Sequence, residues 1–183
     1  MLTDLQTKKL TRYFQIYDID DDGQIDEADF ERIVENVRTL HGAAESSSAY
    51  DLLRAAYSTL WNGLRSSADA DGDGGVDLDE WLAYWQIALE DEARYDAEVR
   101  QLTDRLLALF DLDEDGEIGA AEFIDFYGVF GIAVQLAETV FVELDADGDG
   151  VVTREELLGL SAEFFRGDDP DAPGNLLFGP FGA

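Results

Sequence analysis

The chain has 183 residues, of which 42 are acidic and 12 are basic, so its formal net charge at pH 7 is −30. A balance this acidic disfavours nucleic acid and anionic membrane surfaces as partners, and it favours cations. The absence of cysteine excludes disulfide bonds and metal sites built from thiolates.

The N-terminal segment MLTDLQTKKL lacks the apolar region of a secretory signal. No later apolar stretch approaches the roughly 18 residues that are needed to cross a membrane. We therefore expect a cytoplasmic protein with no membrane insertion, present as a monomer. Hydrophobic residues make up 46% of the chain, which is ample for a folded core.

Four acidic stretches follow one another along the chain, and apolar residues at helical spacing lie on both sides of each. We call them loops one to four: residues 18–29 (DIDDDGQIDEAD), 69–80 (DADGDGGVDLDE), 111–122 (DLDEDGEIGAAE) and 145–156 (DADGDGVVTREE). The residue directly after each loop is large and apolar: Phe30, Trp81, Phe123 and Leu157. The pattern predicts four helix–loop–helix units with apolar faces turned to a core.

Each loop begins with Asp-x-Asp-x-Asp-Gly and ends with a carboxylate at its twelfth position. Loops two to four match the EF-hand calcium-loop signature, and loop one departs only at its last position. Ca²⁺ prefers about six to eight oxygen ligands, and glycine at position 6 permits the sharp turn that aims them inward. The sequence therefore resembles the EF-hand superfamily and predicts up to four Ca²⁺ ions.

The loop positions assign the predicted metal ligands. Positions 1, 3, 5 and 12 supply carboxylates, position 7 supplies a backbone carbonyl, and position 9 often acts through water. The predicted ligands are Asp18, Asp20, Asp22, Gln24, Asp26 and Asp29 in loop one; Asp69, Asp71, Asp73, Gly75, Asp77 and Glu80 in loop two; Asp111, Asp113, Asp115, Glu117 and Glu122 in loop three; and Asp145, Asp147, Asp149, Val151, Thr153 and Glu156 in loop four. Gly119 leaves position 9 of loop three to water alone.

Asp29 closes loop one where the other loops have glutamate, and its side chain is one methylene shorter. It must either bind through one oxygen or draw the exiting helix inward. One-oxygen binding lowers the coordination number towards six, which suits Mg²⁺. We expect the Asp18–Asp29 site to discriminate less well against Mg²⁺, or to bind Ca²⁺ more weakly, than the other sites.

The expected fold is all-α, with four EF-hand units in two pairs packed into one compact body. We expect an N-terminal pair over residues 1–92, with a polar insertion at 41–48, and a C-terminal pair over residues 93–166. Aliphatic residues at the eighth loop position should form short antiparallel β-bridges between paired loops, and such bridges provide a route to cooperativity. These residues are Ile25, Val76, Ile118 and Val152.

Residues 167–183 contain all three prolines of the chain, so regular helix should end before them. Leu176, Leu177, Phe178 and Phe181 are too apolar for a solvated tail. We expect an extended tail that docks on the body, and the alternative is a frayed terminus.

The whole chain also resembles the sarcoplasmic calcium-binding proteins, with the calerythrin-type proteins as bacterial relatives. The resemblance rests on four EF-hand loops, widely spaced first loops, aromatic helices and the tail residues Gly174, Asn175, Gly179 and Pro180. It implies two pairs in one compact unit and a role in buffering or transporting Ca²⁺.

Two other functions stay open at this point. A calcium sensor exposes an apolar groove, often rich in methionine, to a protein target; this chain has a single methionine, at position 1. The light-emitting calcium photoproteins share this fold and use histidines around a chromophore, whereas His41 is the only histidine here. No nucleophile and base can be paired from these residues, so we expect no enzyme.

Overall fold

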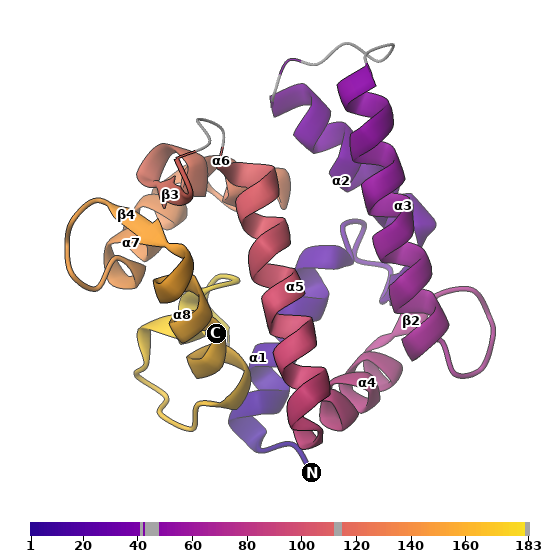
Figure 1. The fold of residues 1–183 in the computed structure, drawn as a ribbon. Coiled ribbons are helices and arrows are strands. Elements are labelled where there is room, and N and C mark those ends of the chain that lie inside the picture. Colours follow the sequence, from indigo (N-terminus) through magenta and orange to yellow (C-terminus); the bar gives the residue numbers. More distant parts are fainter. Residues whose placement is uncertain (41, 43–47, 112–114, 182–183) are drawn as a thin grey trace.

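The computed structural model describes residues 1–40, 42, 48–111 and 115–181. Within these ranges the chain forms eight α-helices, one 3₁₀ helix and two small sheets (Figure 1). The helices are α1 (Asp4–Tyr17), α2 (Glu27–Leu40), α3 (Ser48–Ala68), α4 (Leu78–Glu90), α5 (Glu92–Phe110), α6 (Ala120–Val129), α7 (Val134–Leu144), α8 (Arg154–Arg166) and η1 (Pro173–Leu176). The strands are β1 (Gln24–Ile25), β2 (Val76–Asp77), β3 (Glu117–Gly119) and β4 (Val151–Thr153). None of the described helices is both long and apolar enough to span a membrane.

The strands join the loops in two pairs. β1 pairs with β2 and β3 pairs with β4, both antiparallel. Ile25 lies opposite Val76, and Ile118 lies opposite Val152. All four side chains are buried, because a residue at this place points from the bridge into the core between the helices. The predicted all-α fold, the pairing of the loops and the short β-bridges are confirmed.

An aromatic cluster joins the two pairs. Tyr13 on α1 stacks on Phe178 of the C-terminal segment, with ring centroids 4.1 Å apart. Trp85 on α4 stacks on Phe165 of α8 at 4.4 Å. The indole N–H of Trp81 donates a hydrogen bond to the carbonyl of Leu10, at 3.0 Å in the buried interior. One continuous core therefore runs through both pairs, as the expectation of a single compact body requires.

Asp91 is the single residue between α4 and α5. This residue follows the end of α4, and its carboxylate accepts a hydrogen bond from the Arg94 N–H, which caps α5. Contacts across the pairs come from α4 packing on α5, α1 packing on α8 and α2 packing on α6. Domain boundaries at 92/93 and 166/167 stay a prediction.

The segment after Arg166 differs from the extended tail that the sequence predicts, because it contains the 3₁₀ helix η1. Proline at the start of η1 presets the backbone angle of a helical turn. Leu177 and Phe178 are 1% and 2% exposed. Two side chains hydrogen-bond to the backbone of this segment. The Tyr127 hydroxyl donates to the Leu176 carbonyl at 2.8 Å, and Arg12 donates to the Phe178 carbonyl at 3.0 Å.

Lys9 is fully buried although its side chain carries an ammonium group. The ammonium donates to the carbonyls of Glu163 and Gly167 at the end of α8, at 2.9 and 2.8 Å, and to the Asn175 amide oxygen at 3.1 Å. Three acceptors satisfy three donors, so the buried group is fully hydrogen-bonded. Burial lowers the pKa of Lys9, and the nearby Asp168 and Glu163 oppose that shift. Lys9 thus ties α1 to α8 and to the C-terminal segment.

Candidate metal centres

Each loop turns sharply at the glycine in its sixth position. Gly23, Gly74, Gly116 and Gly150 have φ angles of 90°, 100°, 89° and 95°, a region that side chains with a Cβ rarely adopt. The N–H of each glycine donates to the aspartate at position 1 of its own loop, at 3.0, 3.3, 2.9 and 3.0 Å. The turn therefore folds the loop around its first carboxylate.

The carboxylate at position 5 is held in the same way. Its Oδ1 atom accepts the N–H of position 7 at 2.9, 2.9, 2.9 and 3.1 Å in loops one to four. One oxygen of each of these carboxylates is thereby fixed by the backbone of its own loop. These bonds form within each loop, so they follow from the loop sequence itself.

The result is a cluster of carboxylates in three of the loops. Asp18, Asp20 and Asp22 each offer one oxygen, and these oxygens lie within 4.8 Å of one another. The same holds for Asp69, Asp71 and Asp73, and for Asp145, Asp147 and Asp149. In loop three Asp111 and Asp115 are described, whereas the predicted ligand Asp113 lies outside the described residues. Like charges this close repel one another, and a divalent cation relieves that repulsion.

The carboxylate at position 12 turns back towards its loop. In every loop it accepts the N–H of position 9: Asp29 from Asp26 at 2.9 Å, Glu80 from Asp77 at 3.1 Å, Glu122 from Gly119 at 2.8 Å and Glu156 from Thr153 at 2.9 Å. The exiting helix thus brings a fourth carboxylate to each loop, which is the place that the sequence predicts for it.

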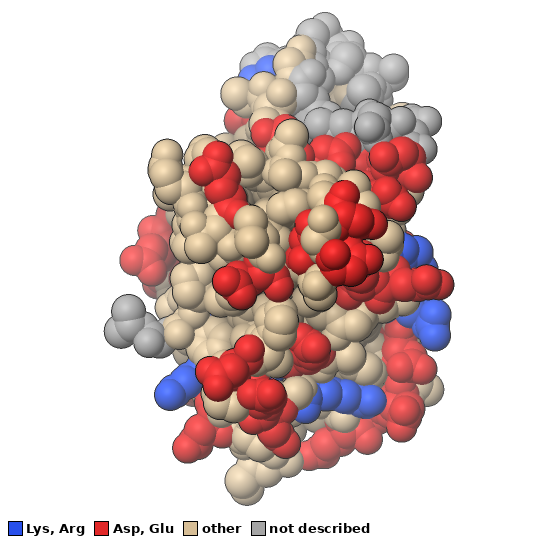
Figure 2. All heavy atoms as spheres, turned by 90° about the vertical axis from the view of Figure 1, so that its left-hand side faces the viewer, with Lys and Arg blue, Asp and Glu red and all other residues tan. Residues whose placement is uncertain are grey.

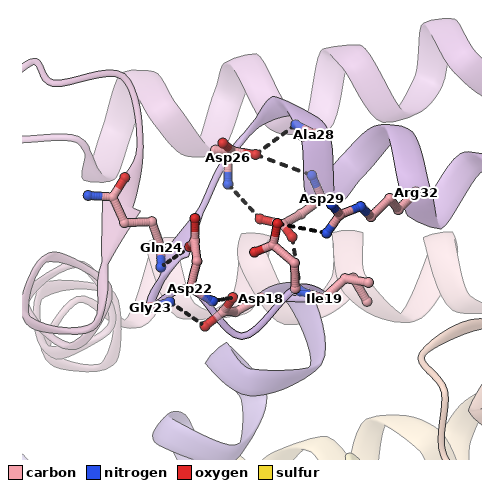
Figure 3. A network of polar contacts seen from close by, with 10 residues as sticks. Asp18, Ile19, Asp22, Gly23, Gln24, Asp26, Ala28, Asp29 and Arg32 are labelled. Atoms are coloured by element: carbon pink, nitrogen blue, oxygen red, sulfur yellow. Dashed lines mark hydrogen bonds and ion pairs between the residues drawn. The ribbon is translucent and has the colours of Figure 1, made fainter.

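Asp29 makes the same contacts as Glu80 although it is shorter. Its second oxygen accepts the Ile19 N–H across the loop at 2.9 Å (Figure 3). The second oxygen of Glu80 likewise accepts the Ala70 N–H at 2.8 Å. Asp29 is only 2% exposed, whereas the glutamates that close the other loops are half-buried. The choice between the two sequence-based alternatives, binding through one oxygen or an exiting helix drawn inward, stays a prediction.

Burial raises the pKa of Asp29, and the hydrogen bonds from Asp26 and Ile19 oppose that shift. The neighbouring carboxylates of Asp26 and Asp20 raise it further. Burial likewise raises the pKa of Asp18. The anionic form of loop one is therefore costly without a cation nearby, which is the electrostatic condition of a cation site.

Position 9 has a second role that the sequence-based assignment missed. The side chains of Asp77 and Thr153 accept the N–H of Glu80 and Glu156 at 2.9 and 3.2 Å, and so they cap α4 and α8. Asp26 accepts the Ala28 N–H at 2.7 Å in the same place. The signal was present in the sequence, because a residue of this kind followed three positions later by a carboxylate is a capping box.

Arg32 is a further residue that the sequence-based ligand list did not contain. Its guanidinium lies 2.8 Å from the Oδ2 atom of Asp20, a predicted ligand of loop one (Figure 3). The corresponding residues after the other loops are Ala83, Asp125 and Gly159, so only loop one has a basic residue at this place. Loop one is thus closed by aspartate in place of glutamate, and a basic residue of the following helix lies against one of its predicted ligands.

Acidic side chains are more widespread than basic ones on the face of the molecule drawn in Figure 2. On the face drawn in Figure 2, acidic side chains gather in separate groups and basic side chains are few. His41, the only histidine, lies outside the described residues.

These loops, with their glycine turns, acidic clusters and paired β-bridges, define an EF-hand protein. Residues 114–163 match a family model described as an EF-hand domain pair, and residues 11–34 and 66–83 match a model described as an EF hand. The chain belongs to the calcium-binding EF-hand proteins, and its relatives include calerythrin and the sarcoplasmic calcium-binding proteins. The family resemblance inferred from the sequence is confirmed.

Relatives cover nearly the whole chain. Calerythrin from Saccharopolyspora erythraea is 24% identical over 169 residues, which is 91% of this chain and 96% of calerythrin. The sarcoplasmic calcium-binding protein, alpha-B and -A chains, from Penaeus sp. is 28% identical over 185 residues, covering 97% and 95% of the two chains. A solved structure of a Streptomyces coelicolor calcium-binding protein, whose description names prokaryotic calcium-mediated regulation, is 27% identical with a TM-score of 0.70. The match covers 90% of this chain and 99% of that protein's chain.

Proposed function

We propose that the protein is a cytoplasmic Ca²⁺ buffer or transporter that binds one ion in each of its four loops and acts as a monomer without catalytic activity. The three acidic clusters and the closing carboxylates support ion binding in loops one, two and four. For loop three, the match of its sequence to the same signature supports a fourth site. Four divalent ions would raise the net charge from −30 by eight units and relieve repulsion within the loops.

One observation carries the choice of a buffer over a sensor. The apolar interior of the second pair retains a cavity of only about 10 Å³, and Leu177 of the C-terminal segment lines it beside Phe110, Phe126 and Leu160. In an EF-hand sensor this kind of apolar surface becomes available to a target. Here the protein's own C-terminal segment occupies it, and Lys9 and Tyr127 hold that segment in place.

Isothermal titration of the chelator-treated protein with Ca²⁺, repeated in millimolar Mg²⁺, tests ion binding. We expect up to four ions per chain, with Mg²⁺ competing most strongly at the Asp18–Asp29 site. Titration of three ions would contradict the proposed ion in one of the four loops, and fewer than three would contradict the proposal as a whole, because three clusters are assembled.

A calcium sensor is the second candidate, and it is favoured by the Streptomyces coelicolor relative, whose description names calcium-mediated regulation. A dye that binds exposed apolar surface separates the two functions. Dye fluorescence that falls on addition of Ca²⁺ supports the buffer, and fluorescence that rises supports the sensor.

A further inference from the structure

Gln24 is a residue of loop one whose side chain contacts loop two. Its backbone is part of loop one: its N–H donates to Asp22, and its carbonyl is the predicted metal ligand at position 7. Its side chain points away from the carboxylates of loop one (Figure 3). Because β1 pairs with β2, that side chain lies over loop two.

The Gln24 amide reaches a predicted ligand of loop two. Its Nε2 atom donates to Oδ2 of Asp73 at 3.3 Å, while Oδ1 of Asp73 accepts the Gly75 N–H at 2.9 Å. Both oxygens of this carboxylate are therefore held by hydrogen bonds, one from its own loop and one from the neighbouring loop. Partners of this kind orient a metal ligand and tune its affinity.

Gly75 leaves the space that the Gln24 side chain fills. A Cβ atom at residue 75 would lie 2.4 Å from Oε1 and 3.1 Å from Cδ of Gln24. Gly75 is not among the residues with a positive φ angle, so its backbone does not require glycine. A Cβ at this residue would instead displace the end of the Gln24 side chain. Position 7 contributes only a backbone carbonyl to a metal, and its side chain is otherwise free to vary.

The second pair lacks this arrangement. Its position 7 residues are Glu117 and Val151, and β3 pairs with β4 as β1 does with β2. Among the described residues, the Glu117 side chain makes no hydrogen bond to loop four. The bridge is thus a property of the first pair and not a consequence of pairing alone.

We propose that Gln24 is a positioning residue that couples the two metal sites of the first pair, with Gly75 as the space that admits it. An ion that draws the Gln24 carbonyl into loop one fixes the start of its side chain, and the amide then holds Asp73 ready for an ion in loop two. Coupling of this kind is reciprocal, so an ion in loop two also favours binding in loop one. The inference rests on the proposed function, since it requires ions in loops one and two.

The test uses the full-length chain with loops three and four silenced by Glu122→Gln and Glu156→Gln. Calcium titration of this parent should show two ions that bind cooperatively. Gln24→Ala should weaken binding about tenfold, as loss of a partner that orients a ligand does, and should remove the cooperativity. Gln135→Ala, the same change at an exposed residue of α7 outside the loops, should alter neither quantity.

A cycle with Gly75→Ala distinguishes this role from a general structural one. Gly75→Ala should weaken binding in the parent, because the new Cβ displaces the Gln24 amide. In the Gln24→Ala background it should have no further effect. An equal loss in both backgrounds would overturn the bridge, as would Gln24→Ala binding within twofold of the parent with unchanged cooperativity. A parent that binds no ion would overturn the proposed function as well.

Discussion

Truncation of Leu177 to alanine tests how strongly the C-terminal segment stabilises the second pair. Leu177 is 1% exposed, and the cavity beside it measures only about 10 Å³. The removed methyl groups would leave a new void, because the rings of Phe110, Phe126 and Phe123 around it come from helices that are fixed elsewhere. Leu→Ala at such a buried site costs about 2–5 kcal/mol of unfolding free energy. For a chain of this size each 1 kcal/mol lowers Tm by about 2–4 °C.

The assay is thermal unfolding followed by circular dichroism in saturating Ca²⁺, with Leu52→Ala as the matched control. Leu52 is 73% exposed on α3, so its truncation should change the unfolding free energy by less than about 0.5 kcal/mol. Taking about 3 kcal/mol for Leu177→Ala, we expect Tm to fall by about 6–12 °C. Binding of an apolar-surface dye to the folded variant should rise at the same time.

A Leu177→Ala protein whose Tm falls no further than that of Leu52→Ala would contradict this prediction. Such a result would mean that the C-terminal segment contributes little to the stability of the second pair. The presence of the segment in the second pair would then no longer favour a buffer over a sensor.

Three further predictions concern loop one and the buried tyrosines. Asp29→Glu should raise the preference for Ca²⁺ over Mg²⁺ at this site by about tenfold, because a longer carboxylate can bind through two oxygens; an unchanged competition titration would contradict it. Arg32→Gln should strengthen Ca²⁺ binding in loop one about twofold, since an exposed ion pair such as Arg32–Asp20 is worth about 0.5 kcal/mol, and 0.5 M salt should abolish the difference. Burial raises the pKa of Tyr57 and Tyr127 above 10.0, so the folded form keeps these protons where the unfolded chain loses them. Unfolding free energy should therefore fall as pH rises above 10, and urea midpoints that stay constant from pH 9 to 11.5 would count against this.

Features set within a loop were predictable from the sequence. The glycine turns, the inward carboxylates and the bridge residues Ile25 and Val76 follow from spacing over twelve residues, because the hydrogen bonds that fix them form inside the loop or between paired loops. The family pattern of paired EF-hands supplied the pairing itself. A motif of twelve residues therefore contains most of the groups that determine the geometry of its own loop.

Features that join distant segments were not predictable in the same way. Lysine side chains are mostly exposed to solvent. Lys9 is buried instead, because residues 163, 167 and 175 supply its three acceptors. Tyr13 lies at the centre of the aromatic cluster, but its place there depends on α4, α8 and the C-terminal segment meeting around α1. Nothing in the spacing along α1 specifies those neighbours. The 3₁₀ turn at Pro173 likewise depends on the surface on which it packs.

The two pairs reach a similar loop geometry by different means, and the difference bears on how each would respond to an ion. In the first pair the Gln24 amide hydrogen-bonds to the neighbouring loop, and the Arg32 guanidinium forms an ion pair with the predicted ligand Asp20. In the second pair the described contacts between loops are those of the β-bridge, and the added support comes from the core side, through Leu177. A side chain that touches a ligand changes ion affinity directly, whereas a side chain in the core acts on stability. Substitutions in the first pair should therefore move binding constants with little change in Tm, and substitutions around the C-terminal segment should move Tm first.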